Sequence, residues 1–229
     1  MTNNNLLLIL SFLIIFLSCS SKKKIYYLQD SDNYESLNLT YDDYNVDIDD
    51  ILKIDIKSSD PELELIFSST NLNSSLTNRD SYLLNGYQID TDGMIDLPQV
   101  GKIYVKGMSL KDIKSTIIDT ITKNEILNNP YIDIKLLNSH FTILGEVNMP
   151  GKYVYDQNNL NVFEAIGIAG DLTINGKRAD VKVIREKNGK KNIFTVDLTS
   201  VDFMNSKYYQ IFSKDIIIIS PNTNRVKNA

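Results

Sequence analysis

Alternating apolar and polar residues predict β-strands along the middle of the chain. Residues 51–56 place Leu52, Ile54 and Ile56 on one face and charged residues on the other, which is typical of a half-buried strand. The same kind of pattern predicts further strands at residues 82–89, 94–97, 102–105 and 131–137.

Turn residues separate these strands. Asp92-Gly93 is a hairpin signal, because both residues tolerate the positive φ of a tight turn, so the strands after it are expected to continue the same sheet. Residues 68–80 are rich in Ser, Asn and Thr and are predicted to form a loop. Asn128-Asn129-Pro130 is a breaker just before the last strand of this region.

One helix is predicted between these strands. Ser109 is a natural N-cap, and Asp112 lies in the first turn, where negative charge is favourable. Apolar residues then recur at helical spacing: Leu110, Ile113, Ile117 and Ile121, with Ile118 widening the stripe. Strands, helix and strand together predict an α+β domain over residues 41–137.

A second domain is predicted over residues 138–221. It begins with a hairpin whose turn contains Pro150-Gly151. A short helix follows Asn161, with Glu164 three residues later as in a capping box, and Gly170 can end it. A second hairpin around residues 188–189 and a last strand at 216–219 complete the layout of a β-grasp domain, followed by a tail at 222–229.

The N-terminus has the pattern of a targeting signal. The apolar run Leu6–Leu17 is too short to span a membrane and suits the apolar region of a signal peptide over residues 1–18. Ser18-Cys19 follows at once, and this arrangement resembles a lipobox, which implies cleavage before Cys19 and acylation of its thiol. Residues 19–40 would then form a lipidated tether, whereas a plain signal peptide with an incidental cysteine is the alternative.

Composition narrows the function classes. The net charge of −5 without long basic clusters gives no electrostatic footprint for nucleic acid. With one cysteine and one histidine, the chain can form no internal disulfide and is a poor candidate for a structural zinc site. His140 is accompanied by no nucleophile motif, so the sequence predicts neither an enzyme nor a cofactor.

Three other patterns have an ordinary explanation beside a functional one. The Asp90–Asp96 segment resembles part of a calcium loop, but Gln88 and Gln99 stand where carboxylates are needed, so a hairpin turn is favoured over a metal site. The scattered Asp and Glu residues are expected to be solvated and not a glycosidase pair. The 13 tyrosines could stack on sugars or simply reflect strand composition, and no ligand-binding residue is identified.

Several motifs resemble those of the polysaccharide export outer-membrane proteins, which are lipoproteins of capsule and exopolysaccharide secretion. In the first domain these are residues 44–54 (YNVDIDDILKI), 86–101 (GYQIDTDGMIDLPQVG) and 129–132 (NPYI). The family enters the first of them through Pro-Gly-Asp, of which only Asp50 is present here. Residues 145–153 (GEVNMPGKY) resemble the soluble-ligand-binding β-grasp domain, or SLBB domain, that follows in this family.

The resemblance implies a non-enzymatic role in polysaccharide export, with Cys19 carrying the lipid. It implies a homo-oligomeric ring that is anchored in the outer membrane, has its folded part in the periplasm and guides a polysaccharide chain. It also implies an inner-membrane co-polymerase, often linked to a tyrosine kinase, as partner. A periplasmic sugar-binding or scaffold lipoprotein is the alternative. No span-forming segment follows Pro221, so the pore is expected to come from a partner, from a longer chain, or not at all.

Overall fold

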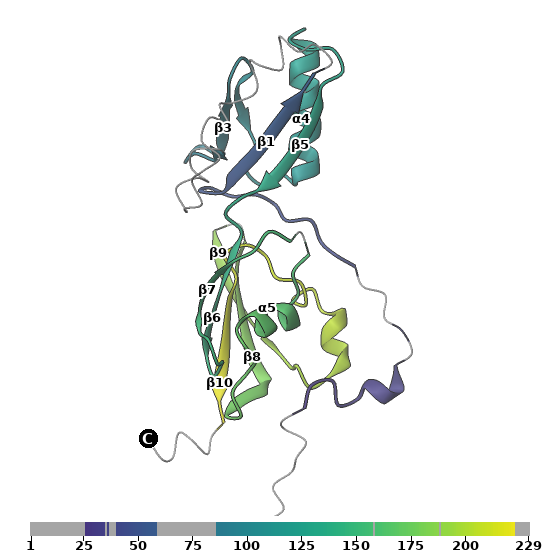
Figure 1. Cartoon of the computed structure of the whole chain (residues 1–229), viewed down its shortest axis with the longest axis vertical. Helices are drawn as coiled ribbons and strands as arrows, with labels where there is room; N and C mark the ends of the chain where they lie inside the picture. The colour runs from purple at the N-terminus through teal and green to yellow at the C-terminus, as the bar shows by residue number, and fades with distance from the viewer. Residues whose placement is uncertain are drawn as a thin grey trace, which may run out of the picture.

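The computed structural model contains two α+β domains arranged end to end (Figure 1). It describes residues 26–34, 36, 40–58, 86–157, 159–187 and 189–222. The predicted signal peptide, Cys19, the loop at 68–80 and residues 82–85 of a predicted strand lie outside the described residues.

The first domain is built on a three-stranded antiparallel sheet in the order β2-β1-β5. Its strands are β1 (Ile51–Lys57), β2 (Tyr87–Gln88) and β5 (Tyr131–Leu136). The predicted apolar face of β1 is confirmed, since Leu52, Ile54 and Ile56 are all buried. Helix α4 (Leu110–Lys123) lies against this sheet and contributes three isoleucines to the core, and Ser109 accepts a hydrogen bond from the Asp112 amide as its N-cap.

The expected single sheet is wrong around the Asp92-Gly93 turn. Gly93 does have positive φ, at 81°, and its amide donates to Asp90 at 3.0 Å. However, β3 (Met94–Leu97) pairs only with β4 (Gly101–Tyr104) in a separate two-stranded sheet, while β2 pairs with β1. The tight turn therefore redirects the chain between two sheets, and the β3-β4 hairpin turns at residues 98–100 instead.

The second domain has the β-grasp topology that the sequence predicts. Its five strands follow the order β7-β6-β10-β8-β9, and β10 runs parallel to β6 while the other pairs are antiparallel. The strands are β6 (His140–Gly145), β7 (Gly151–Val154), β8 (Gly176–Lys187), β9 (Lys190–Val196) and β10 (Ile216–Pro221). Helix α5 (Val162–Ile168) covers one face of this sheet (Figure 1).

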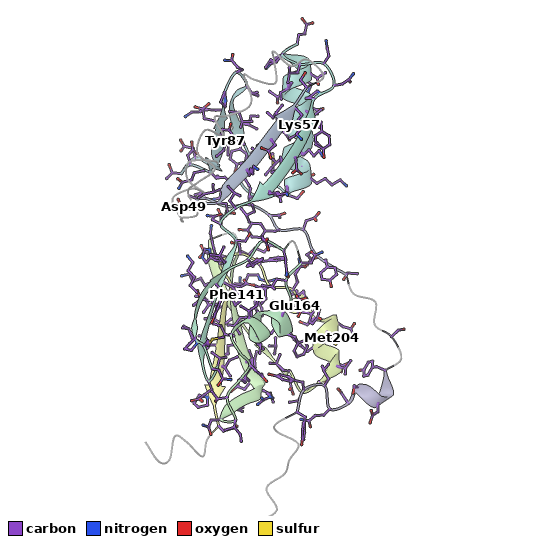
Figure 2. The ribbon with its side chains drawn as sticks, viewed as in Figure 1. Asp49, Lys57, Tyr87, Phe141, Glu164 and Met204 are labelled. Carbon is purple, nitrogen blue, oxygen red and sulfur yellow. The ribbon has the colours of Figure 1, made fainter. Side chains whose placement is uncertain are left out.

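Helix α5 begins at a capping box, as predicted. The Asn161 side chain accepts from the Glu164 amide at 3.0 Å, and the Glu164 carboxylate accepts from the Asn161 amide at 2.8 Å. The core between α5 and the sheet includes Phe141, which is fully buried, while Glu164 lies at the surface of α5 (Figure 2). A 3₁₀ turn, η3 (Val201–Asn205), that the sequence did not predict adds Phe203 to this core.

The N-terminal segment 26–34, which the sequence assigns to a tether, binds along the second domain. It contains a 3₁₀ turn, η2 (Ser31–Asn33), and passes beside η3 before the chain reaches the first domain (Figure 1). The amides of Leu28 and Gln29 donate to the carbonyls of Leu198 and Thr199. Tyr27 packs edge-on against Phe163 of α5.

Candidate functional site

A buried carboxylate stands where the two domains meet. Asp50 precedes β1 and is fully buried. Its Oδ2 accepts hydrogen bonds from the Tyr44 hydroxyl at 2.7 Å and from the Asp47 amide at 2.9 Å. Its Oδ1 lies 2.8 Å from Nζ of Lys214, a residue of the second domain, and this contact is an ion pair without hydrogen-bond alignment. Lys214 also donates to the Ile48 carbonyl at 2.9 Å.

Aromatic rings extend this contact into the second domain. Tyr44 meets Phe212 edge-on, with ring centroids 5.9 Å apart. The guanidinium of Arg185 on β8 lies over the Phe212 ring, 4.2 Å from the ring centroid. Arg185 also forms a forked ion pair with Asp215, in which its Nη2 is 2.6 Å from Oδ2. A continuous series of contacts therefore joins β8 of the second domain to Asp50 of the first.

Hydrogen bonds to the backbone hold the junction at two more places. The Gln210 side chain accepts from the Asp42 amide at 2.9 Å and donates to the Asp42 carbonyl at 3.1 Å. Asn138, in the connection between β5 and β6, accepts from the Ile51 amide and donates to the Asp49 carbonyl. Asp49 lies at the end of the first domain that faces the junction (Figure 2).

The electrostatics of the junction favour binding between the domains over proton transfer. Burial and the nearby Asp50 carboxylate raise the pKa of Tyr44, so its hydroxyl stays protonated and acts as a donor. Burial also raises the pKa of Asp215, while the Arg185 guanidinium opposes that rise. Every one of these groups is bound to a protein partner, and none is aligned as a base beside a nucleophile.

His140 lies beside this junction, at the start of β6. Its side chain is half-buried, and Nδ1 is 2.9 Å from the Asn138 carbonyl. Burial lowers the pKa of His140, which keeps the imidazole neutral near pH 7. Its nearest partner is a backbone carbonyl, so the geometry gives it a structural role.

The Asp90–Asp96 segment uses its first carboxylate for the turn itself. Asp90 Oδ1 accepts from the amides of Asp92 at 3.0 Å and Met94 at 2.8 Å. Within the described part of the chain, no three His, Cys, Asp or Glu residues gather as metal ligands would. Likewise, none of the described helices is long and apolar enough to cross a membrane.

Sequence reasoning identified Asp50 as part of a motif but not the second-domain residues of the junction. Lys214, Arg185 and Gln210 lie more than 130 residues further along the chain, in irregular segments or on a strand face. A lysine and a glutamine in loops carry no periodic signal, so only the fold brings Lys214 to Asp50 and Gln210 to the backbone of Asp42. Cys19, the predicted lipid site, lies outside the described residues and stays a prediction.

Comparison with known proteins bears on the first domain directly. Residues 39–137 match the family described as polysaccharide biosynthesis/export protein. The first domain is therefore similar to this family. The match ends one residue after β5, and the buried Asp50 and its Tyr44 partner lie within it.

A curated relative points the same way. The EPS I polysaccharide export outer membrane protein EpsA of Ralstonia solanacearum is 23% identical over 140 residues. The alignment covers 59% of this chain and 36% of that protein, so the chain matches little more than a third of the relative's length.

Proposed function

We propose that this chain is a non-enzymatic, lipid-anchored component of capsule or exopolysaccharide export across the periplasm and the outer membrane. The match of residues 39–137 to the polysaccharide biosynthesis/export family carries the proposal. The junction supports it, because its buried charged groups bind each other and fix two domains together. A protein that guides a polymer needs a shaped surface and no reactive group.

The proposed role in guiding a polysaccharide chain leads us to propose a ring of several subunits. A conduit must surround its cargo, and one pair of domains of this size cannot enclose a polysaccharide chain. Several copies would close through head-to-tail contacts, and closure makes weak contacts cooperative. The locked junction favours closure, because a subunit with a fixed angle between its domains presents its interfaces in a fixed direction.

The partners follow from the same role. Lipid at Cys19 would hold the ring at the outer membrane with the folded domains in the periplasm. Polymer would arrive from an inner-membrane polysaccharide co-polymerase, often linked to a tyrosine kinase, and pass along the axis of the ring. The acidic chain, with a net charge of −5, has no long basic cluster in its sequence that would suggest nucleic acid as a partner.

Deletion of the gene tests this function. The deletion strain should retain polymer inside the cell and lose it from the surface, and the wild-type gene supplied in trans should restore it. Cross-linking in intact membranes should give a ladder of homo-oligomers. Only monomers, together with normal surface polysaccharide in the deletion strain, would favour a sugar-binding or scaffold lipoprotein instead.

A further inference from the structure

Three apolar side chains are exposed together at the end of the second domain remote from the first. Ile174 is 74% exposed, Met149 is 53% exposed and Ile168 is 42% exposed. They come from different segments: Met149 from the turn between β6 and β7, Ile168 from the end of α5, and Ile174 from the loop before β8. We call these three residues the apolar tip.

Backbone hydrogen bonds connect the three segments that carry the apolar tip. The Met149 amide donates to the Ala169 carbonyl at 2.9 Å, next to Ile168. The Thr173 amide, next to Ile174, donates to the Glu146 carbonyl at 3.0 Å. The two loops and the end of α5 are therefore held together, unlike apolar residues on independent loops.

The acidic groups around the apolar tip are turned toward the protein. The Asp171 carboxylate accepts from the Tyr27 hydroxyl and from the Leu172 amide. The Glu146 carboxylate accepts from the Thr173 hydroxyl at 2.6 Å. These hydrogen bonds leave both carboxylates charged but direct an oxygen of each toward the protein.

The path of the chain would bring the proposed anchor at Cys19 to the same end. The described chain begins at Tyr26, at the lower end of the second domain in Figure 1, and Tyr27 is bound there by Asp171 and by the Arg178 guanidinium. Seven residues lead back from Tyr26 to Cys19, and even fully extended they span about 25 Å. Lys22, Lys23 and Lys24 lie between them, and cations are favoured beside anionic headgroups.

We propose that the apolar tip inserts into the headgroup region of the phospholipid leaflet that holds the anchor at Cys19. This inference rests on the lipid anchor of the proposed function and extends it. One end of the second domain would then be fixed to the membrane by acyl chains and by Met149, Ile168 and Ile174. The domain would thereby gain a defined orientation that a flexible tether alone does not give.

Tryptophan fluorescence tests the contact, because the natural chain contains no tryptophan. Full-length lipoprotein carrying Ile174→Trp is reconstituted in phosphatidylethanolamine and phosphatidylglycerol vesicles whose acyl chains are brominated. Ile193→Trp is the matched control, since Ile193 is 63% exposed but lies on β9, away from the tip. Met149→Trp gives a second tip position on another loop if the first variant folds poorly.

Quenching by brominated lipid should be about twofold or more stronger at position 174 than at position 193, since interfacial segments bury apolar groups about 5–10 Å deep. Mass spectrometry of the same sample establishes acylation. An acylated protein with no quenching at 174 or 149, or with equal quenching at 193, would overturn the tip contact and leave the export role standing. An unacylated protein would overturn the anchor and the contact together.

Discussion

Lys214 Nζ lies 2.8 Å from Asp50 Oδ1, and this ion pair joins the two domains. The partners differ in environment: Asp50 is fully buried, whereas the Lys214 side chain is 34% exposed. Removal of the carboxylate therefore leaves a lysine that can reach water, but removal of the lysine leaves a buried charge. Substitutions of Asp50 and Lys214 should therefore lower the free energy of unfolding by different amounts.

Lys214→Met should destabilise the protein more than Asp50→Asn does. A buried charge that loses its partner costs about 3–5 kcal/mol, while the partly exposed lysine limits the cost of Asp50→Asn to about 1–3 kcal/mol. Urea denaturation measures both free energies of unfolding. Lys53 and Asp55 form a matched surface pair 3.2 Å apart, each 41% exposed, so Asp55→Asn should cost less than about 1 kcal/mol.

The junction variants should also loosen the angle between the domains. X-ray scattering of Lys214→Met should show a broader range of molecular dimensions than the wild type. Equal losses of stability for Lys214→Met, Asp50→Asn and Asp55→Asn, with unchanged scattering, would show that the ion pair does not hold the domains at a fixed angle.

A comparison of substitutions at Gly93 and Gly107 separates the cost of backbone strain from the cost of steric crowding. Both have positive φ, at 81° and 80°, but a Cβ at Gly93 would lie 2.6 Å from Lys106 Cβ, whereas a Cβ at Gly107 meets nothing within 4 Å. Gly107→Ala should cost about 1–2 kcal/mol through strain alone. Gly93→Ala should cost about 1–3 kcal/mol more, because the backbone around Lys106 must move. Thermal unfolding of the two variants compares them, and similar losses would argue against the clash.

Calcium should leave the melting temperature of the wild type unchanged. The Asp90 carboxylate already accepts from the amides of Asp92 and Met94, so the turn is complete without a metal. A melting temperature that rises with calcium and falls again with chelator would instead support a metal site at this turn.

The local parts of the fold were predictable, because each depends on neighbours in sequence. The Ser109 cap and the isoleucines of α4 follow from helical spacing, and the Asn161–Glu164 capping box follows from a four-residue pattern. The β-grasp order of strands followed from the succession of hairpin, helix, hairpin and strand. These signals are short-range, so a single sequence contains them.

The junction and the bound N-terminal segment depend on contacts between distant residues. Asp50 meets Lys214 across 164 positions, and Tyr27 meets Asp171 across 144 positions. Segment 26–34 has no apolar periodicity, since it binds through backbone and carboxylate hydrogen bonds, which leave no repeating pattern. The split into two sheets was missed because an Asp-Gly turn indicates a reversal but not which strands pair.

Cys19→Ala should abolish lipid attachment. Cys19 carries the only thiol in the chain, so the variant should incorporate no radiolabelled fatty acid and should accumulate as precursor or mislocalised protein. Two or three acyl chains anchor stably, at about 0.8 kcal/mol for each buried methylene, so any processed protein that lacks them should leave the membrane fraction more readily. Ser18→Ala, which keeps a small residue before the cysteine, is the control. Equal labelling of wild type and Cys19→Ala would rule out this anchor.

Binding of the N-terminal segment should weaken in acid. Asp30 accepts hydrogen bonds from the Val201 amide at 2.7 Å and the Ser200 hydroxyl at 2.8 Å, and these bonds lower the pKa of its carboxyl below the usual 3.8. A lowered folded-state pKa means that the stabilisation is present above the unfolded value and is lost as pH falls through the folded one.

Amide exchange of Leu28 and Gln29, whose amides donate to the second domain, measures this binding. Asp30→Asn should expose both amides to faster exchange at pH 7, because the neutral amide accepts more weakly from Val201. At a pH below the lowered pKa the wild-type carboxyl is protonated too, so the two proteins should converge. The control is Asp32→Asn, which changes a neighbouring carboxylate on η2 and should leave both amides protected. Asp30→Asn that exchanges like wild type at pH 7 would show that backbone and aromatic contacts alone hold the segment in place.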